Sequence, residues 1–86
     1  MTEILAVFRS RSQAIDCNAR LRVAGIPAGL INTPKEANVG CGLSIKFPHG
    51  MLERAKAVVR SGGYSAFYGF FKVYSTCGKT IIGKIG

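Results

Sequence analysis

The fold of this 86-residue chain is decided by the stretch ILAVFRSRSQAIDCNARLRVAGI, residues 4–26. Its first five residues form a continuous apolar run that is long enough for a buried strand and too short for a helix. Small and apolar side chains then recur at helical spacing until Gly25, which is a natural stop. Ser10 or Ser12 can cap this helix, because a hydroxyl oxygen accepts an otherwise unpaired amide hydrogen bond. The stretch predicts a strand followed by an amphipathic helix.

Three further strand-like segments follow, at residues 28–33, 43–47 and 64–76. The first is bounded by prolines, the second alternates apolar and polar residues, and the third is rich in aromatic residues. A second amphipathic helix begins near Pro48 and ends at Gly62-Gly63. The order strand, helix, strand, strand, helix, strand is that of the ferredoxin-like βαββαβ two-layer sandwich. We therefore expect an α+β fold, with one antiparallel sheet under two helices.

The chain is expected to form one domain over residues 1–76, followed by a glycine-containing C-terminal tail over residues 77–86, in which a short added strand fits at Ile81-Ile82. A chain of this length buries one modest core. No apolar run is long enough to cross a bilayer. Glu3 precedes the basic residues of the N-terminus, which is the wrong order for a secretory signal. We expect a cytoplasmic protein with no membrane partner.

The chain is strongly basic, with twelve Lys and Arg residues against four Asp and Glu residues and a net charge of +8. Such an excess predicts attraction to anions, including nucleic acids and acidic proteins. The basic residues are scattered along the sequence, which is equally typical of an ordinary soluble surface. Composition alone leaves both interpretations open.

Three cysteines are present, and no pair has the C-x-x-C spacing of a redox or zinc motif. In a reducing compartment all three should be thiols. Cys17 lies on the apolar stripe of the first helix and is expected in the core. Cys77, in the tail, is expected to be an incidental surface thiol. Cys41 differs from both, because it stands between two glycines just ahead of a strand.

The expected topology gives Cys41 a specific environment. In a ferredoxin-like sheet the strands lie in the spatial order fourth, first, third, second, so the third strand begins where the first one ends. Cys41 should therefore lie near the start of the first helix, beside Arg9, Ser10, Arg11 and Ser12. A helix N-terminus carries partial positive charge and spare amide donors, which favour a thiolate. The pKa of the Cys41 thiol is accordingly expected to fall.

The glycines on either side of Cys41 support the same hypothesis. Gly40 and Gly42 allow the backbone to turn sharply, and their N–H groups stay open to an anion. The alternative is a glycine turn with an incidental buried cysteine, because free cysteine is among the most buried residue types. The residues alone leave these two interpretations open.

Other chemistry finds little support in the sequence. His49 is expected at the opposite end of the third strand from Cys41, which disfavours a nucleophilic cysteine–histidine pair. A zinc site formed by His49 and the three cysteines fits no known ligand spacing. We expect no metal and no other cofactor, and a carrier or binding protein is favoured over an enzyme.

The aromatic strand suggests a second function class. Strict alternation predicts two faces: Tyr68, Phe70, Lys72 and Tyr74 on one, and Phe67, Phe71 and Val73 on the other. One face must pack under the helices, and the other could bind RNA or a second copy of the chain. The third strand lacks the signature of RNA-recognition motifs. We therefore rank a homo-oligomer through the sheet face above nucleic-acid binding, and keep a protein- or RNA-binding module as the alternative function.

Residues 7–47, VFRSRSQAIDCNARLRVAGIPAGLINTPKEANVGCGLSIKF, and residues 51–64, MLERAKAVVRSGGY, resemble the selenium/sulfur carrier protein-like family. The shared elements are Ala24-Gly25-Ile26, Thr33-Pro34 before a polar loop, and Cys41-Gly42 before a strand. The similarity extends over roughly residues 5–73.

The resemblance implies that Cys41 carries sulfur or selenium as a persulfide-type adduct and passes it between partner enzymes. A cysteine desulfurase, or another sulfur- or selenium-handling enzyme, is the expected partner. The predicted binding residues are Gly40, Gly42, Arg9, Ser10, Arg11, Ser12, Thr33 and Pro34.

Overall fold

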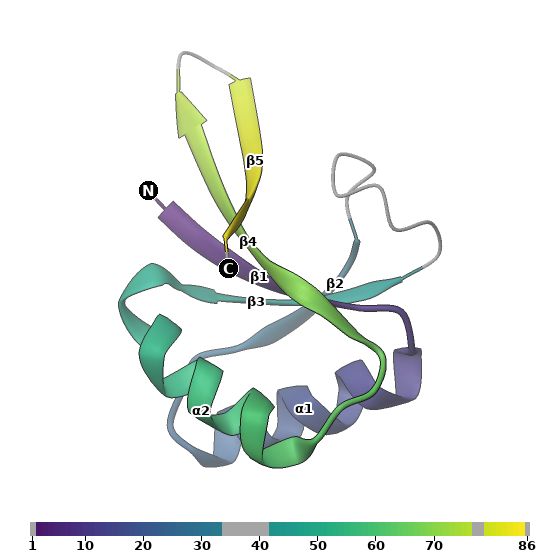
Figure 1. Cartoon of the computed structure of the whole chain (residues 1–86). Helices are drawn as coiled ribbons and strands as arrows, with labels where there is room; N and C mark the ends of the chain where they lie inside the picture. Colours follow the sequence, from purple (N-terminus) through teal and green to yellow (C-terminus); the bar gives the residue numbers. More distant parts are fainter. Residues whose placement is uncertain (1, 34–41, 77–78, 86) are drawn as a thin grey trace.

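The computed structural model describes residues 2–33, 42–76 and 79–85. Two helices lie on one side of an antiparallel sheet, which makes a two-layer α+β sandwich (Figure 1). The elements in chain order are β1 (Thr2–Phe8), α1 (Arg11–Val23), β2 (Gly29–Asn32), β3 (Leu43–Pro48), the short 3-10 helix η2 (His49–Met51), α2 (Leu52–Gly62), β4 (Phe67–Thr76) and β5 (Lys79–Ile85). The α+β class predicted from the sequence is confirmed.

The sheet has five strands in the order β2-β3-β1-β4-β5. The first four strands keep the expected spatial order, with β1 and β3 side by side at the centre. β5 pairs with the outer side of β4, so the complete sheet differs from the four-stranded ferredoxin-like arrangement. Residues 79–85, which the sequence placed in a tail, form this strand, and it is longer than the one considered at Ile81-Ile82.

Helix α1 begins and ends where the sequence indicates. Ser10 is the cap: it has extended backbone angles, and its Oγ accepts a hydrogen bond of 3.3 Å from the backbone N–H of Gln13. Ser12 lies inside the helix. At the other end Gly25 has φ of 85°, and the N–H of Ile26 donates to the carbonyl of Leu21 at 3.0 Å. This left-handed conformation, which glycine adopts without strain, ends the helix.

The core lies between the helices and one face of the sheet. Both helices direct small or apolar side chains toward β1 and β3, and Cys17 is wholly buried there, as the helical stripe predicts. The buried members of this cluster are Ile4, Ala6, Phe8, Ala14, Cys17, Leu21, Ile26, Ala28, Leu43, Ile45, Phe47, Ala55, Val59 and Phe70.

A β-bulge between β1 and β4 changes which aromatic side chains face the core. Val7 pairs with Gly69 and Phe8 pairs with Phe67, so Tyr68 has no partner of its own on β1. The irregularity lies next to Gly69, and a glycine within a strand often marks a bulge. One extra residue inverts the assignment of every side chain before it, because side chains alternate along a strand.

The predicted faces of β4 are therefore wrong around the bulge. Phe67 and Phe70 both pack against the core under the helices. Tyr68 packs with Phe71 and Val73 on the opposite face. Leu5, Val7 and Phe71 are the buried members of this second cluster. Leu5 and Val7 alternate along β1 with core residues, so this cluster lies on the face of the sheet away from both helices.

Neither helix of the described segments is long and apolar enough to cross a membrane.

Candidate functional site

The predicted site is described in part. Cys41, Gly40 and Pro34 lie outside the described residues, and so does Cys77. The geometry of the site is given by Thr33, by Gly42 and by the segment of residues 9–12.

Gly42 lies where three strands meet. Phe8, the last residue of β1, pairs with Leu43, the first residue of β3. The backbone N–H of Thr33, just after β2, donates to the carbonyl of Gly42 at 3.3 Å. The expected neighbourhood of the end of β1 and the start of β3 is therefore present.

Gly42 allows a close approach between two strands. A Cβ atom added to it would lie 2.6 Å from the backbone oxygen of Phe8 and 3.1 Å from Oγ1 of Thr33. Its φ is not among the positive values of the described glycines, which belong to Gly25 and Gly63. The glycine therefore lets β3 begin against the end of β1, while the turn expected at Gly40 and Cys41 lies outside the described residues.

Thr33 has a structural partner that the sequence does not reveal. Its Oγ1 lies 2.7 Å from Oγ of Ser44, within hydrogen-bonding distance. Ser44 is wholly buried, so this contact satisfies a hydroxyl that would otherwise be costly to bury. Thr33 and Ser44 therefore fix β3 against the end of β2, directly beside Gly42.

The start of α1 is electropositive. Its first turn carries no acidic side chain, and Arg11 is exposed within it. The side-chain oxygen of Ser10 accepts a hydrogen bond from the N–H of Gln13. The carbonyl of Ser10 accepts one of 3.1 Å from the N–H of Ala14. The positive end of the helix dipole is thus not neutralised by a carboxylate of its own first turn.

Arg9 has an aromatic neighbour that the sequence did not predict. Its guanidinium carbon lies 4.8 Å from the ring centroid of Tyr68, and Nζ of Lys84 lies at 4.8 Å from the same centroid. Tyr68 stacks on Phe71 with the ring planes at 7° and the centroids 6.0 Å apart. Arg9 therefore belongs to an aromatic and cationic cluster on the face away from the helices. Sequence alternation missed it because the bulge turns Tyr68 to that face.

The described carboxylates leave most basic groups unpaired. Oε1 of Glu3 lies 3.9 Å from Nζ of Lys46, and Oδ2 of Asp16 lies 3.3 Å from Nε of Arg20. Oε2 of Glu53 lies 3.5 Å from Nζ of Lys56. Within the described segments, none of these carboxylates pairs with Arg9 or Arg11. The charges of Arg9 and Arg11, on either side of the Ser10 cap, are therefore not neutralised by a described carboxylate.

Cys17 is chemically unlike a reactive thiol. Burial raises its pKa from 9.0 to about 11, and the neighbouring hydroxyl of Tyr64 opposes this rise only in part. The thiol stays protonated near neutral pH, which makes it a poor nucleophile.

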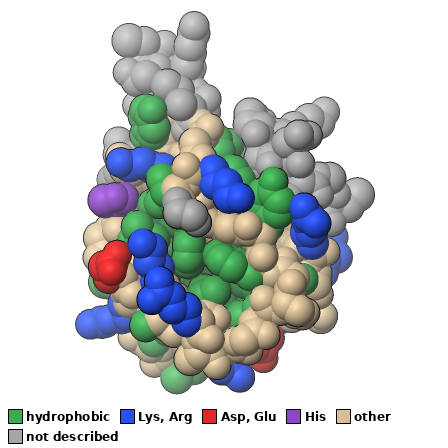
Figure 2. Space-filling model, in the orientation of Figure 1, with side chains coloured by type: hydrophobic (Ala, Val, Ile, Leu, Met, Phe, Trp, Pro, Cys, Tyr) green, Lys and Arg blue, Asp and Glu red, His purple; other side chains and the backbone are tan. Residues whose placement is uncertain are grey.

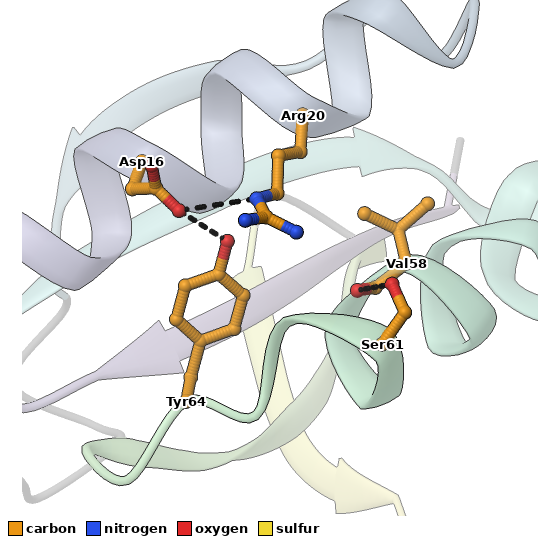
Figure 3. Close-up of polar contacts among 5 residues, drawn as sticks. All are labelled: Asp16, Arg20, Val58, Ser61 and Tyr64. Atoms are coloured by element: carbon orange, nitrogen blue, oxygen red, sulfur yellow. Dashed lines mark hydrogen bonds and ion pairs between the residues drawn. The ribbon is translucent and has the colours of Figure 1, made fainter.

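Tyr64, in the segment after α2, contacts two charged side chains of α1 (Figure 3). Its hydroxyl donates to Oδ2 of Asp16 at 2.6 Å, and Nε of Arg20 lies 3.3 Å from the same oxygen. Burial and this hydrogen bond raise the pKa of Tyr64. The contact links α1 to the segment after α2. Within the last turns of α2, Ser61 Oγ donates to the carbonyl of Val58 at 2.8 Å.

His49 lies at the far end of β3 from Gly42. It opens η2, directly before α2, as expected of a helix-start residue. Among the described residues, no group of three or more His, Cys, Asp and Glu side chains could hold a metal ion.

Comparison with known proteins assigns the chain to a family. The model of the family described as "Putative Se/S carrier protein-like" matches residues 3–68, from β1 to the first residues of β4. That range contains every predicted site residue, whereas β5 lies beyond it. No curated protein matched the chain, and no solved structure matched it. Because the matched range covers most of the chain, the protein belongs to the Putative Se/S carrier protein-like family.

Proposed function

We propose that this protein carries sulfur or selenium, with the cargo atom held on the thiol of Cys41 as a persulfide-type adduct. The observation that carries the proposal is the position of Gly42, the residue bonded to Cys41. Gly42 lies against Phe8, the last residue of β1, and the segment that starts α1 follows directly after Phe8 in the chain. Membership of the Se/S carrier protein-like family supports the choice of cargo.

The transfer step needs only thiol chemistry. The thiolate of Cys41 attacks the outer sulfur of a donor persulfide, a new S–S bond forms, and the S–S bond of the donor breaks. The electron pair of that bond leaves on the donor's thiolate, so no external oxidant or reductant is consumed. An acceptor thiolate then attacks the outer sulfur on Cys41 in the same way. The protein's part is to stabilise the thiolate of Cys41, as attacking group and as leaving group, and to present the bound outer sulfur.

The charges of the described residues suit an anionic adduct. Arg11 is exposed in the first turn of α1, and that turn has no carboxylate. Positive charge and helix N-termini favour thiolates over thiols. The same charges stabilise the deprotonated adduct while the protein carries it.

The basic surface suggests how a partner docks. Ten of the twelve Lys and Arg side chains are described, against three carboxylates that are each already within reach of a base. A cysteine desulfurase or another sulfur-handling enzyme with an acidic rim around its own cysteine would be attracted to such a surface. A reducing cytoplasm is the compartment in which the free thiol would persist.

Cysteine-resolved mass spectrometry tests the proposal. The protein is incubated with a cysteine desulfurase and cysteine, and the mass of each cysteine-containing peptide is measured. An added sulfur is expected on Cys41 and is expected to be lost in Cys41→Ser. Cys17→Ser and Cys77→Ser serve as matched controls and should load normally. Loading that survives Cys41→Ser unchanged would rule the proposal out.

A second candidate function, the binding of single-stranded RNA, is favoured by one observation. Tyr68 is only partly buried and lies near both Arg9 and Lys84 on the face without helices. Aromatic rings that stack bases beside cations that meet phosphates are typical of such sites. This function predicts salt-sensitive RNA binding that Tyr68→Ala weakens and Cys41→Ser does not. Lys72→Ala is the control, because Lys72 pairs with Ile4 and so faces the helix side.

The same face could instead join two copies of the chain. The partly buried hydrophobic side chains packed on the buried cluster of this face would provide the apolar surface of such an interface: Ile31, Tyr68, Val73 and Ile82. Light scattering distinguishes this proposal from the others, since a strict monomer at high protein concentration would exclude it.

A further inference from the structure

A groove lies between α2 and β4, apart from the candidate carrier site. It encloses about 480 Å³ and is lined by Lys56, Val59, Arg60, Gly63, Tyr64, Phe67 and Phe70. Hydrophobic side chains gather in a hollow between these two elements, with basic side chains along the α2 side (Figure 2).

The floor of the groove is apolar and fixed in place. Val59 is 6% exposed and Phe70 is 7% exposed, so both present only their outer edge. The rings of Phe67 and Phe70 meet edge to face with their centroids 4.9 Å apart. Tyr64 is held from behind by its hydrogen bond to Asp16 and by an edge contact with Phe8 at 5.5 Å. Such a floor needs little reorganisation to accept an apolar ligand.

Two local features of the sequence build this floor. Gly63 has φ of 59° and ends α2 in the left-handed conformation, so the chain turns back toward the sheet. A Cβ atom at Gly62 would overlap the ring of Tyr64, so only glycine lets that ring lie against the end of the helix. The bulge at Tyr68 then directs Phe67 to the helix side.

The rim of the groove is cationic. Lys56 and Arg60 are separated by one turn of α2 and line the same side of the groove. Lys56 lies 3.5 Å from Glu53, whose side chain is 89% exposed, so this pair is screened and weak. Arg60 pairs with no acidic group in the part of the chain that the structure describes. A ligand that fits must therefore carry negative charge at one end and an apolar body at the other.

We propose that this groove binds a medium-chain alkyl carboxylate. The alkyl chain lies on Val59, Phe67 and Phe70, and the carboxylate meets Arg60 with support from Lys56. The volume falls within the range of about 300–1,000 Å³ that is typical of small-molecule sites. This activity would be independent of Cys41, because no groove residue belongs to the carrier site.

The test is a titration of ¹⁵N-labelled protein with sodium decanoate, with decanol as the neutral probe. Saturable shifts are expected at the amides of Gly63, Phe67 and Phe70, and decanoate should bind more tightly than decanol. Arg60→Gln should weaken decanoate binding by about fivefold, which corresponds to about 1 kcal/mol for a solvent-exposed ion pair. Arg54→Gln is the matched control: it makes the same change of charge on the same helix, on an exposed side chain outside the groove.

The outcomes separate cleanly. Equal affinity for decanoate and decanol, or equal effects of Arg60→Gln and Arg54→Gln, would overturn the proposal. So would shifts that never saturate or that centre on another surface. Lys56→Gln provides the same comparison if Arg60→Gln fails to fold. It too should weaken decanoate binding more than Arg54→Gln does.

Discussion

Gly42 lies against the backbone carbonyl of Phe8, so closely that a Cβ atom at this position would begin 2.6 Å from the oxygen. The contact joins the start of β3 to the end of β1. It places the residue after Cys41 at the corner where α1 also begins. The proposed function depends on this corner, and each part of it can be tested.

Gly42→Ala is expected to destabilise the protein. The obstacle is backbone rather than a movable side chain, so β3 must shift, and forced overpacking of this kind costs about 1–3 kcal/mol. The free energy of unfolding in urea measures the effect. Gly29→Ala is the control, since a Cβ atom there meets nothing within 4 Å. Equal stability changes in the two variants would show that the contact with Phe8 does not constrain the corner.

Ser10→Ala should weaken the start of α1. It removes the acceptor of the Gln13 amide, and the loss of such a cap costs about 1 kcal/mol. Ser12→Ala provides the comparison, because Ser12 lies within the helix and caps no amide. Urea unfolding should show the larger loss of stability for Ser10→Ala. A larger loss for Ser12→Ala would show that Ser10 is not the cap.

Cys17 predicts a loss of stability at high pH. Burial raises its pKa from 9.0 to about 11, so the folded state holds its proton where the unfolded state has lost it. The contribution of this pKa difference to the free energy of unfolding is complete below pH 9 and is lost as pH rises toward 11. The free energy of unfolding of the wild type should therefore fall more steeply over this interval than that of Cys17→Ala. Parallel pH profiles for the two proteins would contradict the burial of this thiol.

Tyr64→Phe tests the link between α1 and the segment that follows α2. It removes the hydrogen bond to Asp16, and a bond of this kind contributes about 0.5–1.5 kcal/mol. The double-mutant cycle with Asp16→Asn should show that the two changes are not additive. Tyr74→Phe, at an exposed ring, is the control and should change little. Additive effects would mean that the hydroxyl and the carboxylate do not interact.

The sequence predicts most of the local structure, because the signals are local. The apolar run of β1, the Ser10 cap and the stop at Gly25 each depend on neighbouring residues, and all three are present. The burial of Cys17 follows from helical periodicity in the same way.

The features that the sequence missed depend on distant partners. The bulge at Tyr68 is set by the register between β1 and β4, and alternation within β4 alone cannot show it. β5 becomes a strand because the edge of β4 is free to pair with it. Tyr64 and Asp16 are 48 residues apart, and Thr33 meets Ser44 only because β2 and β3 are neighbours. These contacts follow from the folded topology rather than from any short pattern.

The rates at which the three thiols are alkylated in the native protein test the central claim most directly, because they need no assumption about the donor enzyme. With limiting iodoacetamide near neutral pH, Cys41 should react first, and Cys17 should react only after unfolding. Arg11→Gln should slow the alkylation of Cys41 more than Arg54→Gln does, since Arg11 lies in the first turn of α1. A Cys41 that is as protected as Cys17, or that responds equally to both arginine substitutions, would contradict the account.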